Sequence, residues 1–91
     1  MTTKQKKNKF SKEDTVEKDI KKLVLFNDDV NSFDFVIESL QIVCDFNANQ
    51  AETCTWIAHF KGKCTLKKGT VKKLKPYWKG LTDRNLKVEI Q

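Results

Sequence analysis

Three polar side chains follow directly on a short run of strand-forming residues. Asn27, Asp28 and Asp29 come immediately after the apolar stretch at residues 23–26. Asn and Asp side chains hydrogen-bond to nearby backbone groups, and they therefore favour a turn over continued strand pairing. Two adjacent carboxylates at the end of a strand indicate one of two things: solvated turn residues or a site for a cation.

The second chemical group is His59, the only histidine in the chain, which ends an apolar helical run three residues before Gly62. A histidine here is consistent with a functional role, or with a structural one in which it interacts with the terminal carbonyls and the helix dipole. No serine or cysteine nucleophile stands beside it in a recognisable motif, and no Gly-rich phosphate loop occurs. The sequence therefore predicts a protein that is not an enzyme and that uses no cofactor.

Together these two segments resemble the ClpS adaptor family. In that family, Asn-Asp-Asp at the end of the first strand and His-x-x-Gly after the second helix form one pocket. The matching positions here are Asn27, Asp28, Asp29, His59 and Gly62. The resemblance continues through residues 33–40 and, more loosely, to residues 86–90.

The resemblance implies a function and its partners. A ClpS-like adaptor binds the N-terminal residue of a protein substrate, here a large hydrophobic residue such as Leu, Phe, Tyr or Trp. It then hands the substrate to a Clp-type AAA+ unfoldase, ClpA- or ClpC-like, and its protease. ClpS third helices begin with a more acidic segment that takes part in contacting the unfoldase. Lys72, Lys73 and Pro76 stand in that region here, so the identity of the unfoldase stays open.

A free α-amino group is a compact cation with three N–H donors, so its site needs several acceptors and usually a carboxylate. Asn27, Asp29 and a neutral His59 offer such a set. Side chains alternate along an extended segment, which predicts that Asn27 and Asp29 point to the same side and Asp28 to the other. We therefore expect Asn27 and Asp29 to contact the amine, while Asp28 sets the turn or adds longer-range attraction. The family motif spans all three positions and does not decide between the two carboxylates.

Beside the amine, the resemblance implies a pocket for the first side chain of the substrate. The positions that match its lining are Phe33 and Val36 on the first helix and Thr55 and Ala58 on the second. The alternative for each is a plain core position, because apolar residues at helical spacing usually face a core. Phe33 and Thr55 stand where the family commonly has methionine, and Ala58 where it often has valine. The preferred first residue therefore stays open.

Periodicity and capping residues predict six elements that position these groups. In chain order they are a strand at about 21–27, helices at 33–43 and 50–60, a strand at 63–67, a helix at 71–81 and a strand at 86–90. The expected caps are Ser32, Asn47 or Asn49, Gly62 and Thr70. Pro76 lacks an amide donor and is expected to kink or divide the third helix.

This order, strand, helix, helix, strand, helix, strand, predicts an α+β fold in one small domain, as the length of 91 residues also requires. The ClpS resemblance implies a three-stranded antiparallel sheet packed against the helices. Residues 1–19 are rich in charge and poor in large apolar groups, and we expect them to form a flexible tail before a ClpS-like adaptor domain at residues 20–91.

The net charge gives a second candidate function. It is formally +6, from 18 basic and 12 acidic residues, and lysines interleaved with Tyr77 and Trp78 are compatible with a small basic nucleic-acid-binding domain. Lysines on the outer face of a helix are more often a solvated surface, so we rank nucleic acid below a protein substrate as the partner. The lysines concerned are Lys61, Lys63, Lys67, Lys68, Lys72, Lys73, Lys75 and Lys79.

The cysteines bear on metal binding and on compartment. Cys44, Cys54 and Cys64 are widely spaced, and one histidine does not complete a metal set with them, so we expect no zinc site. Cys44 and Cys54 fall on apolar helical stretches, where a thiol behaves as a small hydrophobe, and this suits a reducing cytosol. No stretch approaches the roughly 20 apolar residues of a membrane-spanning helix. We therefore expect a cytoplasmic protein that does not bind membranes.

Overall fold

The computed structural model describes residues 19–91. The elements are β1 (Lys21–Phe26), α3 (Phe33–Cys44), α4 (Ala48–Lys61), β2 (Lys63–Gly69), α5 (Val71–Asp83) and β3 (Val88–Ile90). This confirms the predicted order of strands and helices. The tail predicted at residues 1–19 lies outside the described residues except for Asp19. None of the described helices is both long and apolar enough to cross a membrane.

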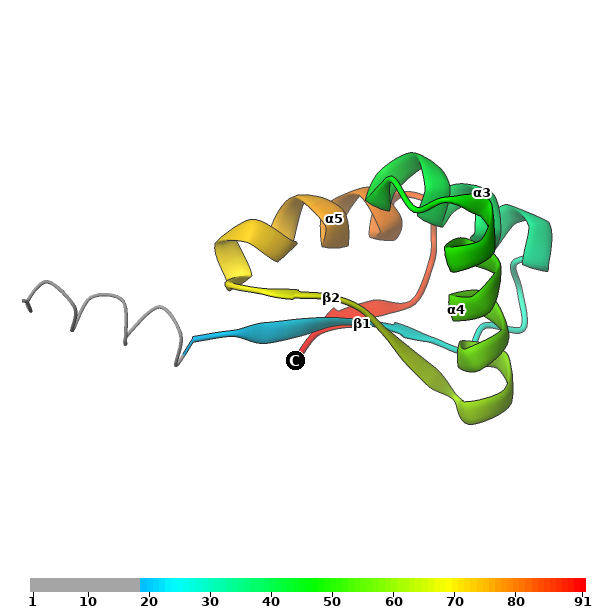
Figure 1. The fold of residues 1–91 in the computed structure, drawn as a ribbon, viewed down its shortest axis with the longest axis horizontal. Coiled ribbons are helices and arrows are strands. Elements are labelled where there is room, and N and C mark those ends of the chain that lie inside the picture. The colour runs from blue at the N-terminus through cyan, green and yellow to red at the C-terminus, as the bar shows by residue number, and fades with distance from the viewer. Residues whose placement is uncertain (1–18) are drawn as a thin grey trace, which may run out of the picture.

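One three-stranded sheet, in the order β2-β1-β3, forms the base of the domain, and both pairings are antiparallel. The helices α3 and α5 lie over one face of the sheet, and α4 stands at the end where β1 stops and β2 begins (Figure 1). The predicted α+β fold with an antiparallel sheet is therefore confirmed.

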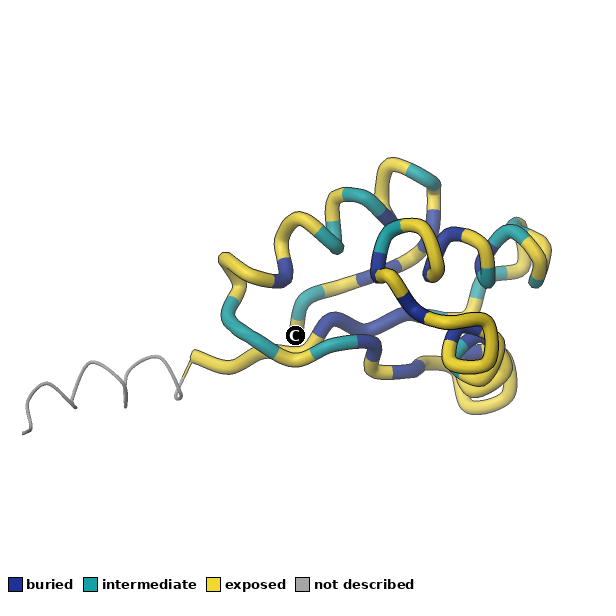
Figure 2. The backbone as a smooth tube through the Cα atoms, turned by 45° about the horizontal axis from the view of Figure 1, so that its top comes forward, coloured by how far each residue is buried: buried dark blue, intermediate teal, exposed yellow. Residues whose placement is uncertain are grey.

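The core is centred on β1. Leu23, Val24 and Leu25 are 0%, 3% and 2% exposed, and buried backbone runs along this strand and along the helix faces turned toward it (Figure 2). A strand of branched aliphatic residues between two hydrogen-bonded neighbours is well suited to complete burial. The position at which β1 stops therefore fixes where the following polar residues lie.

Each helix begins at a residue whose side chain satisfies an otherwise free backbone amide. Ser32, Asn47 and Thr70 accept hydrogen bonds from the amide three residues later, at 3.1, 2.8 and 3.3 Å. Because Asn47 is the cap and Asn49 is not, α4 begins two residues before its predicted start. Gly62 ends α4 with φ +92°, a conformation that favours glycine.

The prediction that Pro76 divides the third helix is wrong, because α5 runs continuously from Val71 to Asp83. Pro76 and Lys72, whose carbonyl loses its amide partner, are both exposed, so water is available to that carbonyl. Leu74 and Leu81, only 2% and 0% exposed, hold the helix against the core on both sides of the proline. Burial on one face thus outweighs the lost hydrogen bond on the other.

The helices α3 and α5 approach each other closely at Gly80. A Cβ atom placed on Gly80 would lie 2.8 Å from Cγ1 of Val43, well inside van der Waals contact. Glycine is therefore required at this crossing because of the space available, despite its low helix propensity.

We predict that Gly80→Ala lowers the free energy of unfolding by about 1 to 3 kcal/mol, because overpacking outweighs the gain in helix propensity. Urea denaturation followed by circular dichroism measures this change. In a Val43→Ala background, which removes the clashing methyl groups, Gly80→Ala should no longer destabilise. Thr82→Ala, at an exposed position of the same helix, is the control. Equal destabilisation by Gly80→Ala in both backgrounds would contradict the packing argument.

Candidate functional site

A backbone hydrogen bond joins the two sequence motifs. The amide of Asn27, directly after β1, donates to the carbonyl of Gly62, directly after α4, at 2.9 Å. The strand register continues from this point, since Phe26 pairs with Lys63. The Asn-Asp-Asp turn and the C-terminal end of α4 are therefore neighbours in the fold, although more than thirty residues separate them in the chain.

Around this junction lies a small cavity of about 20 Å³. It is lined by seven of the eight residues predicted for the site: Asn27, Asp28, Phe33, Val36, Thr55, Ala58 and His59. Leu25 and Asn31 complete the lining. The cavity has room for about one water molecule, so it does not hold a large side chain in this conformation.

Asp28 is among the lining residues and Asp29 is not, which differs from the lining expected from alternating side chains. β1 ends at Phe26, so Asn27 and the residues that follow lie outside the strand. Asp28 instead forms an Asx-type turn, in which its Oδ1 accepts from the amides of Val30 at 2.7 Å and Asn31 at 3.2 Å. The turn brings Asp28 beside Asn27 and leaves Asp29 exposed.

The charge of Asp28 follows from its hydrogen bonds. Partial burial would by itself raise the pKa of this carboxyl, but the hydrogen bonds from Val30 and Asn31 and the nearby positive charge of Lys87 lower it below the ordinary value of 3.8. A carboxyl with a lowered pKa is ionised at neutral pH. The cavity wall therefore carries a fixed negative charge.

Asn31 is a lining residue that the sequence analysis missed. Its side-chain amide donates to Oδ2 of Asp28 and, at 2.9 Å, to the carbonyl of Asn85. It thereby ties the turn to the segment between α5 and β3. Asn31 stands three residues after an aspartate, which is a common spacing in Asx turns. This spacing could have identified Asn31 from the sequence.

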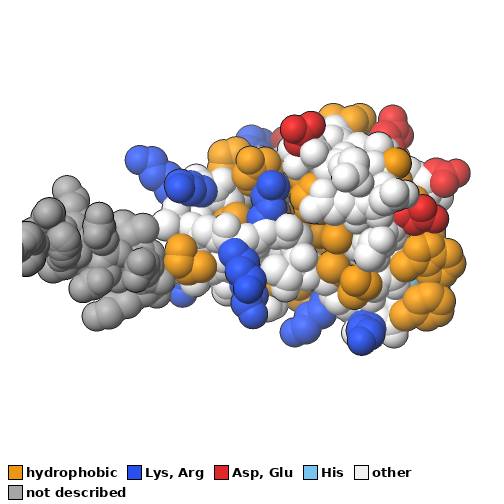
Figure 3. Space-filling view, in the orientation of Figure 1, with side chains coloured by type: hydrophobic (Ala, Val, Ile, Leu, Met, Phe, Trp, Pro, Cys, Tyr) orange, Lys and Arg blue, Asp and Glu red, His pale blue; other side chains and the backbone are white. Residues whose placement is uncertain are grey.

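An aromatic cluster borders the cavity. The Phe33 ring packs edge-on against Trp56 and His59, with ring centroids 4.6 and 5.1 Å apart, and Trp56 stacks on Phe60 at 5.1 Å. Trp56 and Phe60 are 42% and 73% exposed, and hydrophobic side chains gather at the end of the molecule where α4 lies (Figure 3). The sequence analysis did not single out these two residues, whose spacing of four places them together on one helix face.

Thr55 and Phe33 give the cavity its small size and apolar character. The buried Thr55 hydroxyl donates to the carbonyl of Ala51 at 2.8 Å, one turn earlier in α4, so it offers no free donor to a ligand. Phe33 is half-buried, and its ring is held by the aromatic contacts with Trp56 and His59. The polar groups of the site are therefore confined to one end, at Asn27, Asp28 and His59.

The thiols of Cys44 and Cys54 are not activated. Burial raises the pKa of Cys44 to about 11, despite the nearby Lys67. Burial, together with the neighbouring Cys64 and Cys44, raises the pKa of Cys54 to about 12. Both thiols are protonated at neutral pH, whereas a cysteine nucleophile must be a thiolate. Within residues 19–91, no cluster of three or more His, Cys, Asp or Glu side chains is arranged to hold a metal ion.

Comparison with known proteins identifies the family. The model of the family described as "ATP-dependent Clp protease adaptor protein ClpS" matches residues 17–89. A comparison with curated proteins found no match. The matched segment includes all the residues of the cavity and every element of the described domain except the last residue of β3, Ile90. The chain belongs to the ClpS family of Clp protease adaptor proteins.

Proposed function

We propose that this adaptor binds the free N-terminal residue of protein substrates, an N-degron, and delivers them to a ClpA- or ClpC-like AAA+ unfoldase without catalysing a reaction itself. The observation that carries the proposal is that the ionised Asp28 and His59 line the same cavity. Free thiols suit a reducing compartment, and we place the activity in the cytoplasm.

The polar end of the cavity matches the chemistry of an α-amine. A carboxylate has about four lone-pair positions, and the two amides and the Asn31 side chain occupy three of those on Asp28. One acceptor position is left for an N–H of the substrate amine. The Asn27 side-chain oxygen and a neutral imidazole nitrogen of His59 supply two more acceptors, one for each remaining N–H. Asp29, exposed beside the turn, adds longer-range attraction.

The apolar end of the cavity is proposed to take the first side chain of the substrate. Phe33, Val36, Thr55 and Ala58 form its wall. Because the cavity is about 20 Å³, a large hydrophobic side chain enters only if Phe33 adopts another rotamer, a common adjustment at binding sites. The half-buried Phe33 sits at the edge of the wall, so its ring can turn toward solvent while the entering side chain replaces its contacts.

The amine contact is tested with two matched carboxylate variants. A peptide that begins with Leu should bind, and its N-acetylated form should not, because acetylation removes the charge and two of the three donors. Asp28→Asn should weaken binding by about ten- to a hundredfold, the effect of losing one charge-assisted hydrogen bond. Asp29→Asn should change affinity by less than about threefold, as for an exposed charge. Fluorescence anisotropy measures all of these affinities.

His59→Ala removes a different acceptor, the imidazole nitrogen, and should also weaken binding of the free peptide. Thermal unfolding of each variant checks that the domain is still folded. If the acetylated and free peptides bind equally, or if Asp28→Asn and His59→Ala both leave affinity unchanged, the cavity is not an amine site.

The role of Phe33 is tested by comparing peptides that differ only in their first residue. We predict that Phe33→Ala enlarges the cavity and shifts preference toward larger first residues such as Trp, because it removes the side chain that narrows the cavity. The requirement for a free amine should persist, since the polar end is unchanged. Phe60→Ala, which removes an exposed ring outside the lining, is the control. An unchanged order of preference in Phe33→Ala would show that this ring does not limit the cavity.

Delivery is proposed to require residues 1–19, which precede the adaptor domain. We predict that deleting them leaves the affinity for a Leu-initiated peptide within about twofold, because every lining residue found in the described part of the chain lies between residues 25 and 59. Degradation of a Leu-initiated reporter by the unfoldase and its protease should slow markedly. Equal loss of binding and degradation would mean that these residues help to build the cavity.

A further inference from the structure

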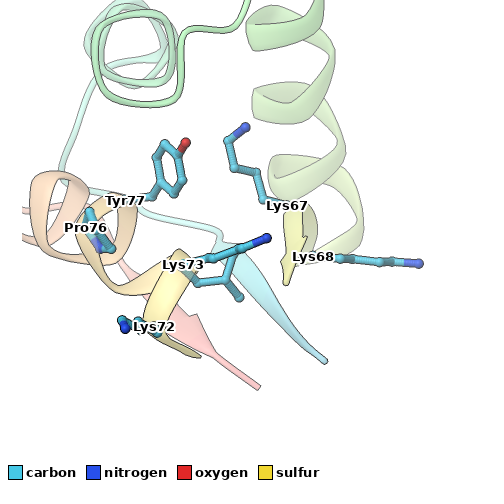
Figure 4. Close-up of a pocket in the computed structure, with 7 residues that line it drawn as sticks. Lys67, Lys68, Lys72, Lys73, Pro76 and Tyr77 are labelled. Atoms are coloured by element: carbon cyan, nitrogen blue, oxygen red, sulfur yellow. The ribbon is translucent and has the colours of Figure 1, made fainter. Parts of the chain in front are cut away.

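A second, larger concave surface lies between the end of β2 and the start of α5. It encloses about 520 Å³ and is lined by four lysines, Lys67, Lys68, Lys72 and Lys73, together with Leu74, Pro76 and Tyr77. Lys67 and Tyr77 point toward one another across it, from β2 and α5 (Figure 4). We call this surface the lysine groove.

We call the small cavity lined by Asn27, Asp28 and His59 the amine cavity. The lysine groove and the amine cavity lie at opposite ends of the sheet. Phe26, beside the cavity, pairs with Lys63 at the start of β2, whereas Lys21 pairs with Gly69 at its end. Six residues of extended strand separate these ends by about 20 Å. A ligand in the groove therefore does not compete with a peptide in the cavity.

A β-bulge aims Lys67 into the groove. The pairing with β1 shifts here, since Thr65 lies opposite Val24 and Lys67 opposite Leu23, which leaves Leu66 as the extra residue of β2. A bulge of this kind reverses the alternation of the side chains that follow it. Lys67 is thereby turned toward the helices, where its Nζ lies 4.8 Å from the Tyr77 ring centroid and 5.5 Å from that of Phe46.

The positive charge of the groove is not neutralised within the described part of the chain. No acidic side chain lines it, and the salt bridge found among residues 19–91 joins Lys79 to Asp83, which lie outside it. The first turn of α5 also contains no acidic residue. Acidic side chains instead gather at the other end of the visible face (Figure 3). Four ammonium groups around one concavity strongly favour an anionic ligand.

The lining residues other than lysine, which we call the floor of the groove, indicate which kind of anion fits. Pro76 and Tyr77 provide apolar surface between the lysines, whereas the lining residue Leu74 is almost fully buried. Stacked nucleobases need open aromatic faces, whereas Lys67 lies over one face of the Tyr77 ring and Trp78 does not line the groove. Carboxylates flanking an apolar side chain fit this arrangement of charge and floor better than a sugar-phosphate chain does.

We propose that the lysine groove binds an acidic peptide segment of a partner protein, with carboxylates on the lysines and an apolar side chain on Pro76 and Tyr77 of the floor. It does so while the amine cavity is free to hold a substrate. The inference concerns a separate surface, so it stands or falls independently of the amine-binding function.

The test uses the full chain and a labelled 12-residue peptide of Glu and Asp around one Leu. Acetylation of its N-terminus excludes the amine cavity. We expect saturable binding that weakens as salt rises. The triple variant Lys68→Gln, Lys72→Gln, Lys73→Gln should weaken it by about tenfold or more, the sum expected for three exposed charge pairs. The matched triple Lys61→Gln, Lys63→Gln, Lys75→Gln removes the same charge outside the groove and should change affinity by less than about twofold.

Further binding measurements distinguish this proposal from binding at the amine cavity and from nucleic-acid binding. Replacing the peptide's Leu by Ser should weaken binding, and a saturating Leu-initiated peptide with a free amine should not displace the acidic one. Equal weakening by both triple variants, displacement by the free-amine peptide, or no binding at 1 mM peptide would overturn the proposal. So would a single-stranded oligonucleotide of equal charge that binds more tightly than the peptide and depends on the same three lysines.

Discussion

The central strand β1 is hydrogen-bonded along both edges, and the remaining elements are arranged around it. β2 pairs with it from Lys21 to Phe26 and β3 from Leu23 to Leu25. A strand buried on this scale must stop where its sequence turns polar, because an unpaired polar run cannot be covered by the core. Because β1 stops after Phe26, the backbone amide of Asn27 meets the carbonyl of Gly62. The amine cavity forms at that junction.

The two ends of the sheet differ in chemistry. At one end, a carboxylate, an imidazole and exposed aromatic rings border a narrow apolar cavity. At the other, lysines surround a wider groove. If both proposals hold, these opposite charge requirements at separate places let one small domain bind two different ligands. An adaptor has to contact both a substrate and a protease component. Separate sites would keep these two partners from competing for the same surface.

Local signals in the sequence were sufficient to predict the order of elements, whereas most of the cavity residues were implied by the resemblance to the ClpS family. Caps such as Ser32 and the glycine after α4 are set by backbone hydrogen bonding within a few residues, so they could be predicted. The choice between Asp28 and Asp29 could not, because it depends on the exact residue at which the strand ends. The β-bulge that aims Lys67 and the small volume left by Phe33 depend on packing between distant segments, which no local pattern encodes.

The Asn31 bridge has a consequence for folding order. It joins residues 54 positions apart, from the turn after β1 to the carbonyl of Asn85. Contacts of such long sequence separation form late, because the loop they close must first lose much of its conformational entropy. The turn that carries Asp28 therefore reaches its final shape only after α5 and β3 have docked. The cavity wall at Asp28 thus depends on the packing of the C-terminal part of the domain as well as on the strand that precedes it.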